Sequence, residues 1–331
     1  MTDLTTDAPA GSEDLERLLE RHRSELTGYC YRMLGSPSEA EDAVQDTLLR
    51  AWRAYDRFEG RSALRSWLYR IATNVCLDML NGRQRRARPM DFGPATSAEA
   101  PNMAQLPEAT WIQPIPDGRV AIAESDPAEL AVSRETIRLA FIAALQHLPP
   151  RQRAVLILRD VLRWKASEVA QLLDTSEASV NSALQRAHAA VAAGNLGASE
   201  AFEPMDDDQR ELLSRYVDAF ERYDIEQLTA LLHEDAIQSM PPYEMWLSGR
   251  DEIITWWTGP GIECKGSRLI PTIANGRPAF GQYRPSGPGG RHEPWALQVL
   301  EIADGRIVEF HAFLDTDQLF PIFGLPRHPD D

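Results

Sequence analysis

A proline- and alanine-rich stretch, residues 87–128, constrains the fold most, because it interrupts a helical pattern on both sides. Residues 13–86 and 127–193 carry apolar residues at the three- and four-residue spacing of amphipathic helices. Between them, RPMDFGPATSAEAPNMAQLPEATWIQPIPDGR has no such period. We therefore expect two helical units joined by a linker or a loosely packed segment.

Length and composition favour several domains in one chain. The 331 residues exceed one ordinary core, and 43% hydrophobic with 25% charged residues is typical of globular proteins. No apolar run approaches the roughly 20 residues of a membrane span, and the polar start MTDLTTDAPAGSEDLE is no secretion signal. Three scattered cysteines favour reduced thiols in the cytoplasm over a disulfide framework or a zinc site, so no metal or cofactor is expected: Cys30, Cys76 and Cys264.

Charge is distributed unevenly along the chain. The formal net charge is −16, and residues 201–331 hold 23 acidic against 11 basic side chains, a net of −12. Residues 50–88 instead hold ten arginines against three acidic residues. An acidic protein thus contains one basic segment that could bind an anionic partner.

The basic segment includes SALRSWLYRIATNVCLDMLNGRQRR, residues 62–86, which predicts a helix with two unlike faces. One face is apolar. The other is polar and aromatic and carries Arg65, Tyr69, Arg70, Thr73, Asn74 and Asp78. Arginine neutralises phosphates, tyrosine can stack on an unpaired base, and asparagine can pair with a base edge. The pattern favours binding to melted DNA, with an ordinary solvated face as the alternative.

A second nucleic-acid signal lies downstream. One helix is expected from residue 127 to the Pro149–Pro150 pair, and another follows it. KASEVAQLL, the turn DTS and EASVNSALQRAHAAVAA then predict a helix-turn-helix, which reads duplex DNA from the major groove. Its presence favours the DNA-binding interpretation of residues 62–86.

The last third of the chain has a different character. After the break GNLGASEAFEPMDDD (194–208), two helices are expected over 208–236 and a third over 249–259. The remainder alternates like a sheet, and ADGR between two β-rich runs indicates a hairpin. This part is predicted to be α+β.

Two motifs in register resemble the extracytoplasmic-function group of the sigma-70 family. AEDAVQDTLLRAW (40–52) and FEGRSALRSWLYRIATNVCLDMLNGRQRR (58–86) are similar to region 2. LPPRQRAVLILRDVLRWKASEVAQLLDTSEASVNSALQRAHAAV (148–191) is similar to region 4. The resemblance implies a non-enzymatic factor that binds core RNA polymerase, recognises −10 and −35 promoter elements and initiates transcription. An ordinary DNA-binding regulator is the rival interpretation.

The resemblance also implies site residues. The implied partner is core RNA polymerase (β′ and β subunits), and docking on β′ is assigned to Asp42, Gln45 and Asp46, with Trp52 packing behind them. The −10 residues are Arg61, Ser62, Leu64, Arg65, Arg70 and Asn74, and the −35 residues are Ser179, Asn181, Ser182, Gln185 and Arg186. The second helix-turn-helix helix lacks two basic residues common in the family, and Asp174 replaces a common glycine. Weaker phosphate attraction is therefore expected.

The C-terminal part resembles the SnoaL-like, ketosteroid-isomerase-like cone fold. The resemblance implies a pocket, for which the candidates are Trp246, Trp256, Tyr283, Trp295 and His311, together with Tyr243, Glu309 and Asp315. The pocket could be plain core, bind a small-molecule effector or perform chemistry, and no catalytic residue is assigned. Fusion to sigma regions implies regulation in cis, with TWIQPIPD (110–117) as a hydrophobic staple between domains.

The expected architecture is therefore multidomain. Two all-α domains, a region 2 helical bundle and a region 4 helix-turn-helix, precede an α+β SnoaL-like cone. The expected bounds are 13–88 for region 2, 89–127 for the linker, 128–194 for region 4 and 205–327 for the cone.

Overall fold

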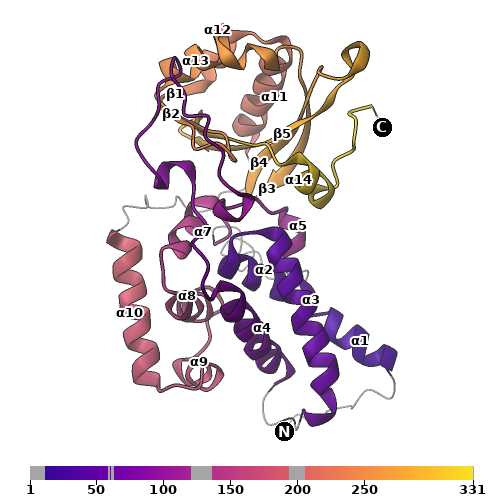
Figure 1. Ribbon diagram of the computed structural model, residues 1–331, viewed down its shortest axis with the longest axis vertical. Coiled ribbons are helices and arrows are strands. Elements are labelled where there is room, and N and C mark those ends of the chain that lie inside the picture. The colour runs from indigo at the N-terminus through magenta and orange to yellow at the C-terminus, as the bar shows by residue number, and fades with distance from the viewer. Residues whose placement is uncertain (1–11, 59, 61–62, 121–135, 194–205, 331) are drawn as a thin grey trace. The chain divides into compact units, whose positions relative to one another are not determined.

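The computed structural model describes residues 12–58, 60, 63–120, 136–193 and 206–330 (Figure 1). The expected −10 residues Arg61 and Ser62 lie outside these ranges. The chain divides into two compact units. The first draws on Met1–Gln84, Arg119–Ser125 and Leu145–Asn195, and the second on Arg85–Gly118, Asp126–Ala144 and Leu196–Asp331.

The N-terminal part of the first unit consists of helices α1 (Ser12–Glu20), α2 (Arg23–Leu34), α3 (Pro37–Ala54) and α4 (Leu64–Leu80). The residues between α2 and α3 explain why one helix ends and the next begins there. Gly35 has φ +73°, the left-handed conformation that often ends a helix. The Ser36 hydroxyl accepts a hydrogen bond from the Glu39 N–H at 3.5 Å, and Pro37 begins α3.

The helix-turn-helix also belongs to the first unit. It follows α7 (Leu139–Gln146), α8 (Pro150–Leu156) and the π-helical turn η4 (Ile157–Val161), and it consists of α9 (Ala166–Leu172) and α10 (Glu177–Ala193). The turn between α9 and α10 passes through Asp174 at φ +50°. Glycine adopts this conformation without strain and aspartate tolerates it, which explains the glycine common there in the resembled family.

Within the described residues, the helix expected from residue 127 to the Pro149–Pro150 pair corresponds to the shorter helix α7. It begins at Leu139, and residues 127–135 lie outside the described ranges. The carbonyl of Ile137 accepts a hydrogen bond from the Asn275 side chain, and the carbonyl of Arg138 accepts the Ile142 N–H. The Ile137 carbonyl thus bonds to a hairpin turn of the second unit, whereas the Arg138 carbonyl already makes a helical hydrogen bond with α7.

A six-stranded sheet forms the centre of the second unit, in the order β2-β1-β6-β5-β4-β3. Its strands are β1 (Leu232–Ser239), β2 (Trp246–Ser248), β3 (Arg268–Ala274), β4 (Arg277–Arg284), β5 (Glu293–Ala303) and β6 (Arg306–Phe313). Neighbours are antiparallel except β1 and β6. The hairpin predicted at ADGR is confirmed: Asp304 and Gly305 have φ +49° and +67°, as a tight hairpin turn requires.

Helices cover the sheet on both faces. Residues of α11 (Asp207–Arg222), α12 (Ile225–Leu231) and α13 (Arg250–Thr258) share one core cluster with the sheet, and α14 (Thr316–Phe323) shares a second (Figure 1). The expected helix over residues up to 236 ends at Leu231 instead, and β1 begins at Leu232. Pairing of β1 with the distant strand β6 overrides the local helical pattern.

Residues 85–118 belong to the second unit and are packed more closely than their composition predicts. Their backbone pairs with the loop that follows β1. The Leu106 N–H donates to the Pro242 carbonyl at 3.1 Å, and the Glu244 N–H donates to the Ala104 carbonyl at 2.9 Å. The isolated bridge between Gln105 and Tyr243 continues this pairing. We call residues 85–118 the docked linker.

The apolar residues of the docked linker are buried. Trp111, Ile112 and Ile115 are each 3% exposed or less. Trp111 follows the short 3-10 helix η3 (Glu108–Thr110), and its Nε1 donates to the Leu106 carbonyl at 3.2 Å. This burial lies within the second unit, and the role of TWIQPIPD as a staple between domains stays a prediction. Residues 121–127 of the expected linker lie outside the described ranges.

Candidate nucleic-acid interface

Helix α4 carries the described residues predicted to recognise the −10 element. Arg70 and Asn74 are exposed, and Leu64 and Arg65 are half-buried. Arg65 is already engaged: its Nε donates to Glu25 Oε2 on α2 at 2.7 Å. Its guanidinium carbon also lies 5.2 Å from the centroid of the ring of Tyr69. Binding of Arg65 to DNA would compete with these contacts.

Two residues expected on the DNA-facing side of α4 are buried. Tyr69 and Thr73 are both 0% exposed. The Tyr69 ring meets the rings of Tyr29 and Trp164 edge-on, each with a centroid distance of 5.2 Å. The Tyr29 and Thr73 hydroxyl oxygens lie 2.7 Å apart. The expectation of a solvent-facing Tyr69 is wrong, because α4 packs against neighbours over a wider arc than its apolar stripe indicates.

Part of this packing comes from the helix-turn-helix half of the same unit. The Arg70 Nη2 donates to the Gln171 carbonyl in α9 at 2.8 Å. The guanidinium of Arg65 lies 5.8 Å from the ring of Trp164, which precedes α9 and is 6% exposed. Two predicted −10 arginines therefore contact residues of the predicted −35 domain.

Glu25 is the anion that holds Arg65. Burial alone would raise the pKa of Glu25, but hydrogen bonds from His22 and Arg65 outweigh it and hold that pKa below its ordinary value. The Tyr69 hydroxyl also donates to Glu25 Oε2, at 3.3 Å. Glu25 is thus ionised at neutral pH, and it orients both polar groups of α4 that face it.

Helix α10 presents its predicted residues differently. All five predicted −35 residues are exposed: Ser179, Asn181, Ser182, Gln185 and Arg186. The helix is anchored from its opposite side by Val180 and Ala187, which are buried. At its start, the Ser176 hydroxyl accepts the Ser179 N–H at 3.1 Å and caps the helix. The surface is available for a major groove.

The predicted polymerase-binding residues occupy one exposed side of α3. Asp42 and Gln45 are exposed, and Asp46 pairs with Arg50 at 2.8 Å. Trp52 does not pack behind them as expected, since it is 50% exposed, and Leu49 is 43% exposed. The spacing of apolar residues along α3 does not distinguish the exposed Leu49 and Trp52 from residues of the core. Together the side chains form an acidic surface with an apolar end.

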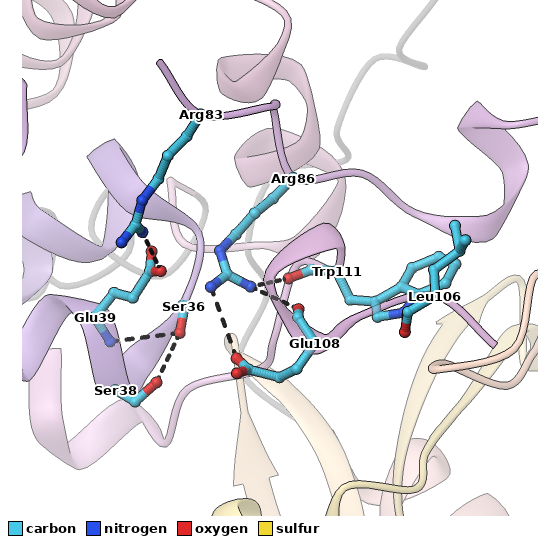
Figure 2. A network of polar contacts seen from close by, with 8 residues as sticks. All are labelled: Ser36, Ser38, Glu39, Arg83, Arg86, Leu106, Glu108 and Trp111. Carbon is cyan, nitrogen blue, oxygen red and sulfur yellow. Dashed lines mark hydrogen bonds and ion pairs between the residues drawn. The ribbon is translucent and has the colours of Figure 1, made fainter. Parts of the chain in front are cut away.

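The basic run after α4 is partly used inside the protein (Figure 2). Arg83 forms an ion pair with Glu39 at the start of α3. Arg86 is 5% exposed, and its Nη1 donates to the Trp111 carbonyl at 2.6 Å and to the Glu108 carbonyl at 3.0 Å. Arg86 therefore stabilises the docked linker, and its charge is not presented to a nucleic acid.

The hairpin between β3 and β4 binds the docked linker through one buried asparagine. The Asn275 N–H donates to the Ile115 carbonyl at 3.0 Å, and Asn275 Oδ1 accepts the Ile115 N–H at 2.9 Å. Asn275 Nδ2 donates to the Ile137 carbonyl, and the Gly276 N–H donates to Asp117 Oδ1 at 2.7 Å. The role of Asn275 was not predicted from the sequence. The Asn-Gly pair predicts a hairpin turn, but it does not indicate which residues that turn contacts.

The five residues predicted for a C-terminal pocket do not surround one cavity. Trp256 lies in the core cluster with α11, and Tyr283 lies in the cluster with α14. Trp246 Nε1 donates to the carbonyl of Gly93 at 3.0 Å. Of the five, Trp295 lines one described cavity and His311 another. Neighbouring side chains on a strand point to opposite faces, so aromatic content alone could not place them together.

His311 takes part in a short chain of hydrogen bonds. Its Nδ1 lies 2.8 Å from Ser239 Oγ, and its Nε2 lies 2.8 Å from Glu309 Oε2. Burial opposes ionisation of Glu309, but the hydrogen bond with His311 outweighs it and lowers the pKa of Glu309. The cavity beside Ser239 and His311 measures about 10 Å³, which is room for a single water at most.

Within the described ranges, no group of three or more His, Cys, Asp or Glu side chains could hold a metal ion. Among the same residues, no helix is long and apolar enough to cross a bilayer.

Three family descriptions match the chain: Sigma-70 region 2 over residues 18–86, Sigma-70 region 4 over residues 138–191, and the SnoaL-like domain over residues 213–310. The ECF RNA polymerase sigma factor SigG of Mycobacterium tuberculosis is 46% identical over 316 residues, covering 95% of this chain and 84% of SigG. SigJ of the same organism is 29% identical over 312 residues, covering 90% and 91%.

The fold agrees with a solved structure as well. The crystal structure of Mycobacterium tuberculosis SigJ superposes with a TM-score of 0.58 at 23% identity, covering 94% of this chain and 99% of SigJ. Helical sigma regions followed by a mixed-sheet SnoaL-like domain are thus a shared architecture. The chain belongs to the extracytoplasmic-function sigma factors of the sigma-70 family.

Proposed function

We propose that this chain binds core RNA polymerase, recognises −10 and −35 promoter elements and initiates transcription in the cytoplasm. The observation that carries the proposal is the exposure of two surfaces in one unit. Asp42, Gln45 and Trp52 are exposed on α3, and the predicted −35 residues are exposed on α10. The acidic surface suits a basic docking site on the polymerase, and α10 suits a major groove.

We further propose that the SnoaL-like domain restrains the sigma regions in cis. Regions 2 and 4 must separate to reach two promoter elements, and the segment between them sets how far they can move. Docking residues 85–118 onto the C-terminal domain removes them from that tether. Asn275 stabilises this state, because it bonds both Ile115 and Ile137. Release of the docked linker would lengthen the tether and permit promoter binding.

The C-terminal domain is proposed to perform no chemistry. Ser239, His311 and Glu309 have the order of a nucleophile, base and carboxylate, but Ser239 is 1% and His311 5% exposed. The adjoining cavity has no room for a substrate. A structural hydrogen-bond chain accounts for these distances. Binding of a small effector, the other role open to such a domain, needs a larger cavity elsewhere.

The test is transcription in vitro with core RNA polymerase on a promoter library from the source genome. Transcripts should appear only when the protein is added, and Asn275→Ala should increase them several-fold. Asn102→Ala is the matched control: it also removes a linker hydrogen bond, to Glu244 at 2.8 Å, but at an exposed position, where the loss should change docking and transcription little. A point substitution is preferable to truncation, since deleting the domain would expose Trp111 and Ile115.

The possible outcomes separate the two proposals. Absence of binding to core polymerase would contradict the sigma function itself. Normal initiation with equal output from wild type, Asn275→Ala and Asn102→Ala would leave that function standing and contradict the restraint in cis.

A further inference from the structure

A cavity of about 500 Å³ lies where the docked linker meets one end of the sheet. Both of its walls belong to the second unit. Glu108 and Trp111 contribute from the linker, and Tyr243, Trp295 and Asp315 contribute from the SnoaL-like domain. Its volume lies in the range of small-molecule sites, roughly 300–1,000 Å³. The lining exists only while the linker is docked.

Aromatic side chains form much of the lining, and several are fixed by other contacts. Trp111 is held by its hydrogen bond to the Leu106 carbonyl (Figure 2) and by the Phe92 ring, 5.4 Å away between centroids. The guanidinium of Arg284 lies 3.7 Å from the centroid of the Trp295 ring. That ring therefore already binds one cation. Rings of this kind attract organic cations through their negative faces.

The charged groups of the cavity are carboxylates. Glu108 and Asp315 both line it. Burial raises the pKa of Asp315, and the negative charge of Glu108 raises it further. Glu108 is also only partly neutralised, because its ion pair with Arg86 is long, at 3.7 Å. An added cation would relieve the repulsion between the two carboxylates.

We propose that this cavity binds a small amphipathic organic cation. The ammonium group lies between Glu108 and Asp315, and the apolar body packs against Trp111, Tyr243 and Trp295. The regulatory consequence rests on the proposed restraint in cis. Because the ligand contacts both walls, it binds the docked state in preference to the released state and stabilises it. The ligand would thus act as an inhibitor of transcription.

The first test is binding of benzyltrimethylammonium to the full chain, measured by titration calorimetry or ligand-observed NMR. We expect a dissociation constant on the order of 1 mM or tighter, which suits a fragment of this size. Benzyl alcohol and phenylacetate are the matched neutral and anionic probes, and each should bind at least about 10-fold more weakly than the cation if the carboxylates select charge. Equal binding of all three, or no binding of the cation, would overturn the proposal.

Substitutions locate the site. Asp315→Asn and Glu108→Gln should each weaken binding of benzyltrimethylammonium about 5-fold, as for a partly screened charge pair. Asp304→Asn is the control, because Asp304 is exposed in a hairpin turn at φ +49° that asparagine also adopts. An unchanged affinity in both cavity variants would overturn the assignment.

Asn275→Ala separates this proposal from the restraint on which it rests. If the linker forms a wall of the site, the substitution weakens cation binding as it raises transcription. Cation binding with the expected charge selectivity, but no transcriptional effect of Asn275→Ala, would support the site and contradict the restraint. Raised transcription in Asn275→Ala, but no cation binding to wild type, would support the restraint and overturn the site.

Discussion

Helices α4 and α10 carry the two predicted DNA-binding surfaces, and they differ in how far their predicted residues are engaged inside the protein. On α4, Arg65 and Arg70 bond to Glu25 and to the Gln171 carbonyl. On α10, all five predicted residues are exposed. From this difference we predict that −35 binding needs no rearrangement of α10, whereas −10 binding requires α4 to exchange internal contacts for DNA. Substitutions at the contacts of α4 should therefore lower the free energy of unfolding more than substitutions on α10.

The largest loss of stability is expected where α4 meets the helix-turn-helix half. Trp164→Ala removes a buried ring that packs edge-on against Tyr69, and it should lower the free energy of unfolding of this unit by about 3 kcal/mol. Urea denaturation followed by circular dichroism measures the change.

Trp52→Ala is the matched control for that substitution. Because Trp52 is 50% exposed, its replacement should change stability by no more than about 0.5 kcal/mol, while weakening core polymerase binding. Equal destabilisation by the two substitutions would contradict the burial that distinguishes these tryptophans.

A smaller loss is expected from Glu25→Gln, which removes the anion that holds Arg65. We expect about 1–2 kcal/mol of destabilisation, the contribution of hydrogen bonds to a charged group. The freed Arg65 should bind single-stranded −10 DNA several-fold more tightly, as fluorescence anisotropy would detect. Glu20→Gln, whose exposed carboxylate pairs with Arg23 at 2.6 Å, should alter neither quantity appreciably. Unchanged DNA affinity in Glu25→Gln would show that Arg65 is not restrained.

The same carboxylate predicts a pH dependence. The pKa of Glu25 is lower in the folded chain than its ordinary value of 4.5. The unfolded chain therefore binds the proton more readily, so the contribution of Glu25 is present above about pH 4.5 and is lost as pH falls through its folded pKa. Denaturation of wild type and Glu25→Gln at several pH values measures this: the gap between them should narrow in acid. A constant gap would contradict the assigned role.

The sequence could predict features that depend on local patterns but not those that depend on contacts between distant residues. Elements with strong local patterns were predictable, such as the helix-turn-helix and the ADGR hairpin. Tyr69 was not, because its burial depends on Trp164, which lies far along the chain. Leu232 begins a strand because of its pairing with β6, which no local period records. Asn275 acts through a contact with Ile115, 160 residues away.

The smallest change in stability is expected on α10. Arg186 is exposed, so Arg186→Ala should leave the free energy of unfolding within about 0.5 kcal/mol of wild type. If Arg186 contacts a phosphate, the substitution should also lower the salt dependence of −35 duplex binding, reducing the slope of log K against log salt by about 1. Anisotropy titrations at several salt concentrations measure that slope. Arg222→Ala, on α11 and paired with Asp218 at 2.6 Å, removes the same charge elsewhere and should leave the slope unchanged. An equal change in both variants would mean that the slope follows net charge alone. That result would contradict the prediction that the exposed surface of α10 binds the −35 element.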